Sequence, residues 1–161
     1  MNFMSHMSYP ALLFVIISKL FGITYSISDL LILILFAALP DFDFLFHRLV
    51  KRGKFDAGFR HHDWFTHWPI TYLPLVVLLI IFPTFKMLLA VLGLYSHFVL
   101  DLFLGNGIMW FYPFSKKKYG FFKITGCHGW DWFKVYRGKL IYKFDVIATI
   151  AIIVIVILKS L

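Results

Sequence analysis

Residues 87–105 read MLLAVLGLYSHFVLDLFLG, and this stretch decides the fold class. It is almost entirely apolar, and a helix needs about 20 such residues to cross a bilayer. His97 and Asp101 stand inside it, four positions apart, so they share one face of the expected helix. Ionisable groups inside a span are costly to insert and are candidates for function. The stretch therefore predicts a membrane helix that carries a polar site.

The composition of the whole chain points the same way. Of its 161 residues, 61% are hydrophobic and 15% are charged, and the mean hydropathy is +0.83. Soluble domains are about 45–50% apolar and about 25% charged, and disordered chains combine low hydrophobicity with high charge. These values argue against a soluble enzyme and against disorder. The formal net charge of +8 favours lysines that flank membrane spans over binding to nucleic acid.

Five apolar stretches predict membrane spans, at about residues 9–25, 29–47, 69–85, 87–105 and 144–159. Lysine and arginine are concentrated after the second and fourth spans, and the positive-inside bias places those segments in the cytoplasm. The N-terminus is then cytoplasmic, and the C-terminus lies outside. We therefore expect an all-α fold, a polytopic transmembrane helical bundle of about five spans.

The chain is expected to form a single membrane-embedded domain, residues 1–161, in three parts. Residues 1–115 form the helical core with the polar site, and residues 144–161 form an anchor helix. Residues 116–143 mix aromatic side chains with lysine, which suits the headgroup zone and predicts a cytoplasmic interfacial segment in contact with membrane lipids.

The motif Leu-Pro-Asp-x-Asp at residues 39–43 falls near the end of the second predicted span. Pro40 lacks a backbone N–H, so it is expected to kink or end the helix. The carboxylates of Asp41 and Asp43 stand among phenylalanine and leucine, where unpaired charges are very costly, and a cation is their natural partner. The alternative is that the two carboxylates cap the cytoplasmic end of the helix beside Arg48.

Histidines accompany these acids, and histidine is the commonest protein ligand for transition metals. Three of them fall within seven residues before the third span, at 61, 62 and 67, and Thr66 is placed to hydrogen-bond a ligand. His6 precedes the first span. In the fourth span, His97 and Asp101 could grip one ion, or they could hydrogen-bond only to each other.

The candidate ligands all lie toward the cytoplasmic ends of the predicted spans, where four helices can converge on one pocket. Mixed histidine and aspartate ligation suits zinc best, with manganese or iron as alternatives. We expect two or three ions, held by the residues His6, Asp41, Asp43, His62, His67, His97 and Asp101.

Other polar residues have simpler interpretations. Asp29 is expected to cap the second helix, Asp145 to lie at the start of the fifth, and His47 to meet lipid headgroups. The Cys-His pair at 127–128 could hold a metal with Asp131, although the neighbouring glycines favour a turn.

Taken in order, these motifs resemble the YdjM-like family of inner-membrane proteins, regarded as membrane-bound metal-dependent hydrolases. That family has an early histidine, Leu-Pro-Asp-x-Asp, His-Arg-Gly-x-Thr-His, Ser-His-x-x-x-Asp and a Trp-x-Pro-Phe-like stretch. The matching segments here are His6, 39–43, 62–67, 96–101 and 110–115. Asp63-Trp64 replaces the usual Arg-Gly, so any substrate contact made by that arginine is not carried over. The family is in turn similar to the zinc-dependent phospholipase C and P1 nuclease group, which implies phosphoester hydrolysis.

The leading hypothesis is a membrane-bound metal-dependent hydrolase whose site faces the cytoplasmic leaflet of the inner membrane. The expected substrate is a phospholipid or a lipid-linked phosphate, attacked by metal-activated water. Asp41 or Asp43 could act as a catalytic residue by orienting that water. Two alternatives remain, a non-catalytic membrane protein with structural metal and a metal or proton transporter. The transporter is disfavoured because the outer halves of the predicted spans offer almost no polar groups.

Overall fold

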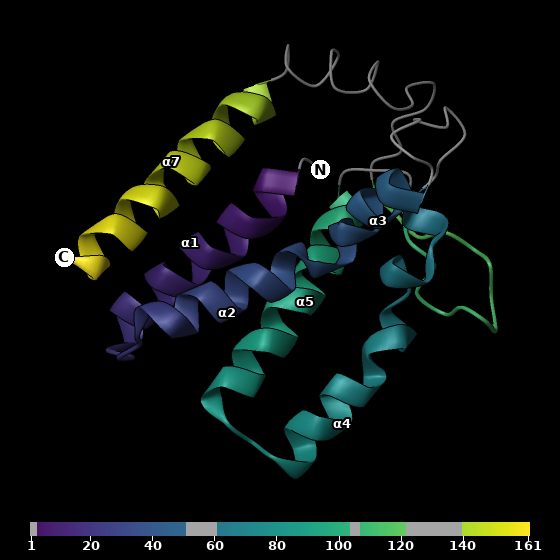
Figure 1. Ribbon diagram of the computed structural model, residues 1–161, viewed down its shortest axis with the longest axis horizontal. Helices are drawn as coiled ribbons and strands as arrows, with labels where there is room; N and C mark the ends of the chain where they lie inside the picture. Colours follow the sequence, from purple (N-terminus) through teal and green to yellow (C-terminus); the bar gives the residue numbers. More distant parts are fainter. Residues whose placement is uncertain (1–2, 51–60, 104–106, 122–139) are drawn as a thin grey trace.

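A computed structural model describes residues 3–50, 61–103, 107–121 and 140–161, and these ranges are built from helices without an extended strand (Figure 1). The all-α prediction is therefore confirmed for the described residues. The longer helices are α1 (Phe3–Phe21), α2 (Ile27–Ala38), α3 (Phe42–Val50), α4 (Leu73–Ile81), α5 (Phe85–Phe103) and α7 (Leu140–Ser160). Four 3-10 turns connect them, namely η1 (Leu39–Asp41), η2 (His61–Asp63), η3 (Phe65–His67) and η4 (Pro69–Tyr72).

Among the described residues, the helices α1 and α5 are long and apolar enough to cross a membrane. The apolar stretch Pro69–Ile81 is shorter. The first helix begins at Phe3, earlier than the predicted start at residue 9, so His6 lies inside α1 and not before it. The fifth predicted segment likewise begins early, at Leu140. Asp145 therefore lies more than one turn inside α7, where its side chain is buried, and not at the helix start as expected.

The second predicted span is interrupted where its proline falls. The helix α2 ends at Ala38, and the 3-10 turn η1, which contains Pro40, leads into α3. This confirms that the proline ends the helix, and it turns the chain just before Asp41. At the other end of α2, Ser26 is the N-cap, and Asp29 at position N3 completes a capping box with it. Asp29 therefore supports the cap, whereas the sequence had predicted it to be the cap itself.

The helices α2 and α5 pack closely because a glycine lies where they cross. A Cβ atom at Gly93 would stand 2.3 Å from the carbonyl oxygen of Leu33 and 3.1 Å from the backbone nitrogen of Ala37. A hydrogen in that position lets the two backbones approach. His97 lies one turn of α5 after Gly93, so the close approach also brings His97 near the last turn of α2.

Two hydrophobic clusters hold the helices together. The first joins α1, α2, α5 and α7 through the buried side chains Ala11, Leu30, Leu33, Leu89 and Ile152. The second surrounds Leu94 and Phe98 on α5 and includes Ile108. In Figure 1, α1 and α7 run side by side, whereas α4 packs on α5 and none of its own residues is buried.

Residues 107–121 fold back on themselves beyond the end of α5, and we call them the 107–121 loop. Ile108 and Tyr119 form an isolated antiparallel bridge with two backbone hydrogen bonds of 3.0 Å. The backbone N–H of Phe121 donates to the carbonyl of Leu102 at 2.6 Å, which fastens the loop to the last turn of α5. The predicted interfacial segment, residues 116–143, lies mostly outside the described residues, as do Cys127, His128 and Asp131.

Candidate metal centre

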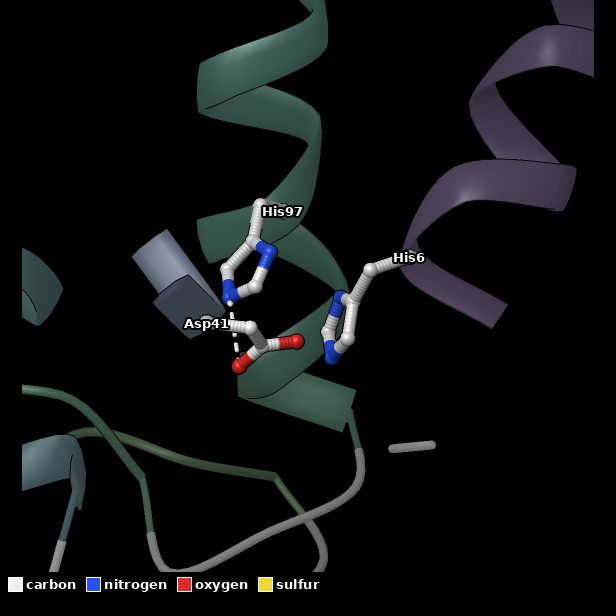
Figure 2. A group of neighbouring side chains, drawn as sticks. All are labelled: His6, Asp41 and His97. Carbon is white, nitrogen blue, oxygen red and sulfur yellow. Dashed lines mark ion pairs between the residues drawn. The ribbon is translucent and has the colours of Figure 1, made fainter. Parts of the chain in front are cut away.

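Six of the seven predicted ligands come together in two groups of three. His6, Asp41 and His97 form the first group, shown in Figure 2, and within each group the ligand atoms lie within 4.8 Å of one another. The second group consists of His62, His67 and Asp101. These residues come from α1, η1, η2, η3 and α5, so the tertiary fold assembles both groups.

The two groups adjoin each other through the carboxylate of Asp101. Its Oδ1 lies 3.2 Å from Nε2 of His6 in the first group. Its Oδ2 lies 3.9 Å from Nε2 of His62 in the second group and 3.3 Å from Nε2 of His97 in the first. The two oxygens of one carboxylate therefore face both groups.

The carboxylate of Asp41 also faces histidines of both groups. Its Oδ1 lies 3.8 Å from Nε2 of His97 in its own group and 3.5 Å from Nε2 of His67 in the other. The Asp41 side chain is 12% exposed, whereas the side chains of His67, His97 and Asp101 are at most 1% exposed. Asp41 is thus the more exposed of the two carboxylates in the centre.

All four histidines present Nε2 to the centre, and three of them have the other ring nitrogen engaged. Nδ1 of His97 donates to the carbonyl of Ala37 at 2.7 Å, and Nδ1 of His62 donates to the carbonyl of Gly107 at 3.2 Å. Nδ1 of His67 faces Oδ2 of Asp43 at 3.3 Å. Such bonds orient the rings so that Nε2 faces the centre, as in metal-binding histidines. In His6, Nδ1 is buried without a hydrogen-bond partner among the described residues.

Asp43, the seventh predicted ligand, lies beside the two groups. It belongs to neither group, and its buried carboxylate accepts a hydrogen bond from the hydroxyl of Thr66 at 3.1 Å beside the ring of His67. Thr66, which was predicted to hydrogen-bond a ligand, thus donates to Asp43 and lies next to His67. The helix α3 begins at Phe42, directly after Asp41, and in its first turn the carboxylate of Asp43 reaches Nδ1 of His67. Asp43 is therefore a partner of a ligand.

The two histidines on the 3-10 turns titrate in opposite directions. Burial lowers the pKa of His62 to about 4, although the carboxylate of Asp101 acts against it. Burial also lowers the pKa of His67, but the hydrogen bonds that its ring donates to Asp41 and Asp43 outweigh burial and raise the pKa to about 9. In the metal-free centre at neutral pH, His62 is therefore neutral and His67 carries a proton. The surplus of carboxylate charge around His67 is what a cation would neutralise.

His47 does not meet lipid headgroups as predicted. Its side chain is 7% exposed, and its ring lies edge-on to Trp64 with the ring centroids 5.8 Å apart.

The sequence could not predict the roles of the carbonyl groups of Ala37 and Gly107, because every residue carries a backbone carbonyl and no side chain marks these two. The glycine at 107 was the one available signal.

The fold and the site define a class of protein, a helical membrane protein with a buried histidine–aspartate centre able to hold metal. A family model described as YdjM inner membrane protein matches residues 1–160, and the chain therefore belongs to that family. This confirms the family resemblance and supports the predicted membrane location. Neither a curated protein nor a solved structure matches the chain.

Proposed function

We propose that this protein is a metal-dependent hydrolase of the inner membrane with two adjacent metal ions, with zinc as the expected metal. The observation that carries the proposal is the convergence of four Nε2 atoms and two carboxylates, with Nδ1 held by an acceptor in three of the four histidines. Metal-binding histidines typically donate their other ring N–H to a carboxylate or a backbone carbonyl in this way. Three ligands for each ion leave a coordination position open, as in catalytic zinc sites.

Each side chain of the centre has a separate role in the proposed reaction. His6 and His97 would hold one ion and His62 and His67 the other, while Asp101 lies between them. A pair of bound ions supplies a nucleophilic hydroxide near neutral pH and stabilises the charge on the leaving group. Asp41, the more exposed of the two carboxylates, would accept the proton of the attacking water. Asp43 supports the reaction by orienting His67.

The position of the centre in the fold supports a lipid-linked phosphoester as substrate. His6 lies in the first turns of α1, Asp41 follows the end of α2, and Asp101 lies in the last turn of α5. The centre thus sits at one end of these helices, and Lys118 lies beside it, paired with Asp63, the residue after His62. We propose that this end faces the cytoplasmic leaflet in a five-span arrangement, where an anionic headgroup would reach the centre.

The proposal is tested by metal analysis and hydrolysis assays on the purified full-length protein in detergent. Wild type is expected to contain about two zinc ions per chain and to cleave a phosphoester from a panel of phospholipids and aryl phosphates. His97→Ala should lose metal and activity, whereas His47→Ala, a buried histidine outside both groups, should lose neither. Wild-type protein without bound transition metal would refute the proposal.

A structural metal site is the second candidate, because the centre is nearly sealed. Of the six ligands, Asp41 alone lies outside the buried class. The two functions differ in the expected effect of Asp41→Asn. Asparagine keeps a side-chain oxygen that can bind metal but cannot take up a proton, so a catalytic centre would lose turnover while it keeps its metal. A structural site would show metal-bound protein without turnover for wild type and variant alike.

A further inference from the structure

We propose that the 107–121 loop is a positioning element for the second group of ligands, and that Gly107 is its principal contact. The inference rests on the proposed metal centre and assigns a role to the aromatic motif at 110–115, which the proposed reaction does not use. Its basis is a set of three contacts between the loop and residues 62–68, the segment that carries His62 and His67.

The three contacts follow each other along that segment. The carbonyl of Gly107 accepts the hydrogen bond from Nδ1 of His62 at 3.2 Å. The ammonium of Lys118 pairs with the carboxylate of Asp63. The ring of Tyr112 stacks on Trp68 with centroids 3.7 Å apart and an interplanar angle of 27°. The loop therefore touches the segment at a ligand, at the residue after it, and at the residue after the second ligand.

The loop is built to hold the Gly107 carbonyl in one place. Gly107 has a φ of +73°, and a Cβ atom there would stand 2.5 Å from the carbonyl oxygen of Tyr119. Only glycine accepts both the dihedral angle and the close approach. The bridge between Ile108 and Tyr119 begins at the next residue, and Phe121 ties the loop to Leu102, the neighbour of Asp101. The loop thus connects the position of the His62 ring to the end of α5.

The first group has no such dependence in the described structure. His97 is oriented by the carbonyl of Ala37 on α2, and His6 is carried by α1. The second group instead takes two ligands from short 3-10 turns, which have few internal hydrogen bonds to fix them. A perturbed loop should therefore weaken one ion site and spare the other.

The contacts differ in expected weight. Loss of the hydrogen-bond partner of a metal-bound histidine typically lowers metal affinity about 10–100-fold. An ion pair between partly exposed side chains contributes about 0–1 kcal/mol, so Lys118 is a minor contact. The variant that tests the proposal is therefore Gly107→Ala, with Lys118→Gln expected to have a small effect.

The test is cobalt titration of full-length protein in detergent, followed by its visible absorption. Wild type should bind two ions, and Gly107→Ala should bind one unchanged and the other about 10–100-fold more weakly. Gly22→Ala is the matched control, since Gly22 has a φ of +65° but no atom within 4 Å of an added Cβ. Tyr112→Ala should shift the cobalt spectrum of the weaker ion, and Tyr112→Phe, which keeps the ring stack, should restore it.

A metal-free measurement separates this inference from the proposed function. Diethyl pyrocarbonate modification, located by mass spectrometry, should label His62 faster in Gly107→Ala than in wild type and leave His97 protected. Wild type that binds no cobalt would refute the metal centre, and faster labelling of His62 would still support the loop's role. Equal labelling of His62, or two unchanged cobalt sites in Gly107→Ala, would overturn it.

Discussion

Nδ1 of His97 lies 2.7 Å from the carbonyl oxygen of Ala37, a residue on a different helix and 60 positions earlier in the chain. This hydrogen bond links the packing of α2 against α5 to the orientation of a candidate metal ligand. It forms because Gly93, one helical turn before His97, lets the two backbones come together. Helix packing and ligand geometry are therefore one feature of this protein.

Gly93→Ala is expected to weaken both the packing of α2 against α5 and the binding of metal by His97. The added methyl would meet the Leu33 carbonyl at 2.3 Å, so α2 must move away, and overpacking of this kind costs about 1–3 kcal/mol. The thermal unfolding midpoint and the cobalt affinity should fall together. Gly22→Ala, which adds the same methyl in open space, should leave the cobalt affinity unchanged. An unchanged cobalt affinity in Gly93→Ala would show that the close approach does not set the ligand geometry.

Asp43 and Asp101 should respond differently to the same isosteric change. Asp43→Asn removes a charged partner of His67, and we expect metal affinity to fall about 10–100-fold with two ions still bound at saturation. Asp101→Asn alters a carboxylate that faces both groups, so the number of bound ions should fall. Isothermal titration with zinc separates affinity from stoichiometry. Identical behaviour of the two variants would contradict the distinction between ligand and ligand partner.

Metal binding should weaken as the pH falls. The pKa of His67 is raised to about 9 in the metal-free centre, so at pH 7 an ion must displace a proton from this ring. His62, whose pKa is lowered to about 4, is already neutral and releases none. Release of one proton lowers the apparent affinity about tenfold for each pH unit below 9. Titrations in buffers of different ionisation enthalpy measure the released proton, and its absence would contradict the assigned protonation of His67.

Removal of metal should destabilise the fold. An ion that binds only the folded state adds about 2.7 kcal/mol when its concentration is 100 times its Kd. Chelation by EDTA should therefore lower the unfolding midpoint of wild type, and added zinc should restore it. In Asp101→Asn the EDTA-dependent shift should be smaller because less metal is bound. A wild-type midpoint that is the same with and without EDTA would count against a metal centre in the folded protein.

Most of the ligand set could be predicted from the sequence because ionisable side chains are rare in apolar segments. Asp41, His97 and Asp101 stand out there, and histidine spacing marks the others. The sequence could not separate Asp41 from Asp43. Both follow Pro40, and the turn η1 and the start of α3 decide that one carboxylate enters the centre while the other lies behind His67.

The sequence by itself determined the membrane class and the helical fold, because composition and local spacing report directly on insertion and helix formation. It also predicted seven candidate ligands, of which six lie in the two groups. The tertiary structure decided how those residues divide into two groups and which backbone atoms orient their rings. The orienting atoms at Ala37 and Gly107 are backbone carbonyls, which no residue type reveals. They become specific partners only when α2 and the 107–121 loop bring them against histidines far away in the chain.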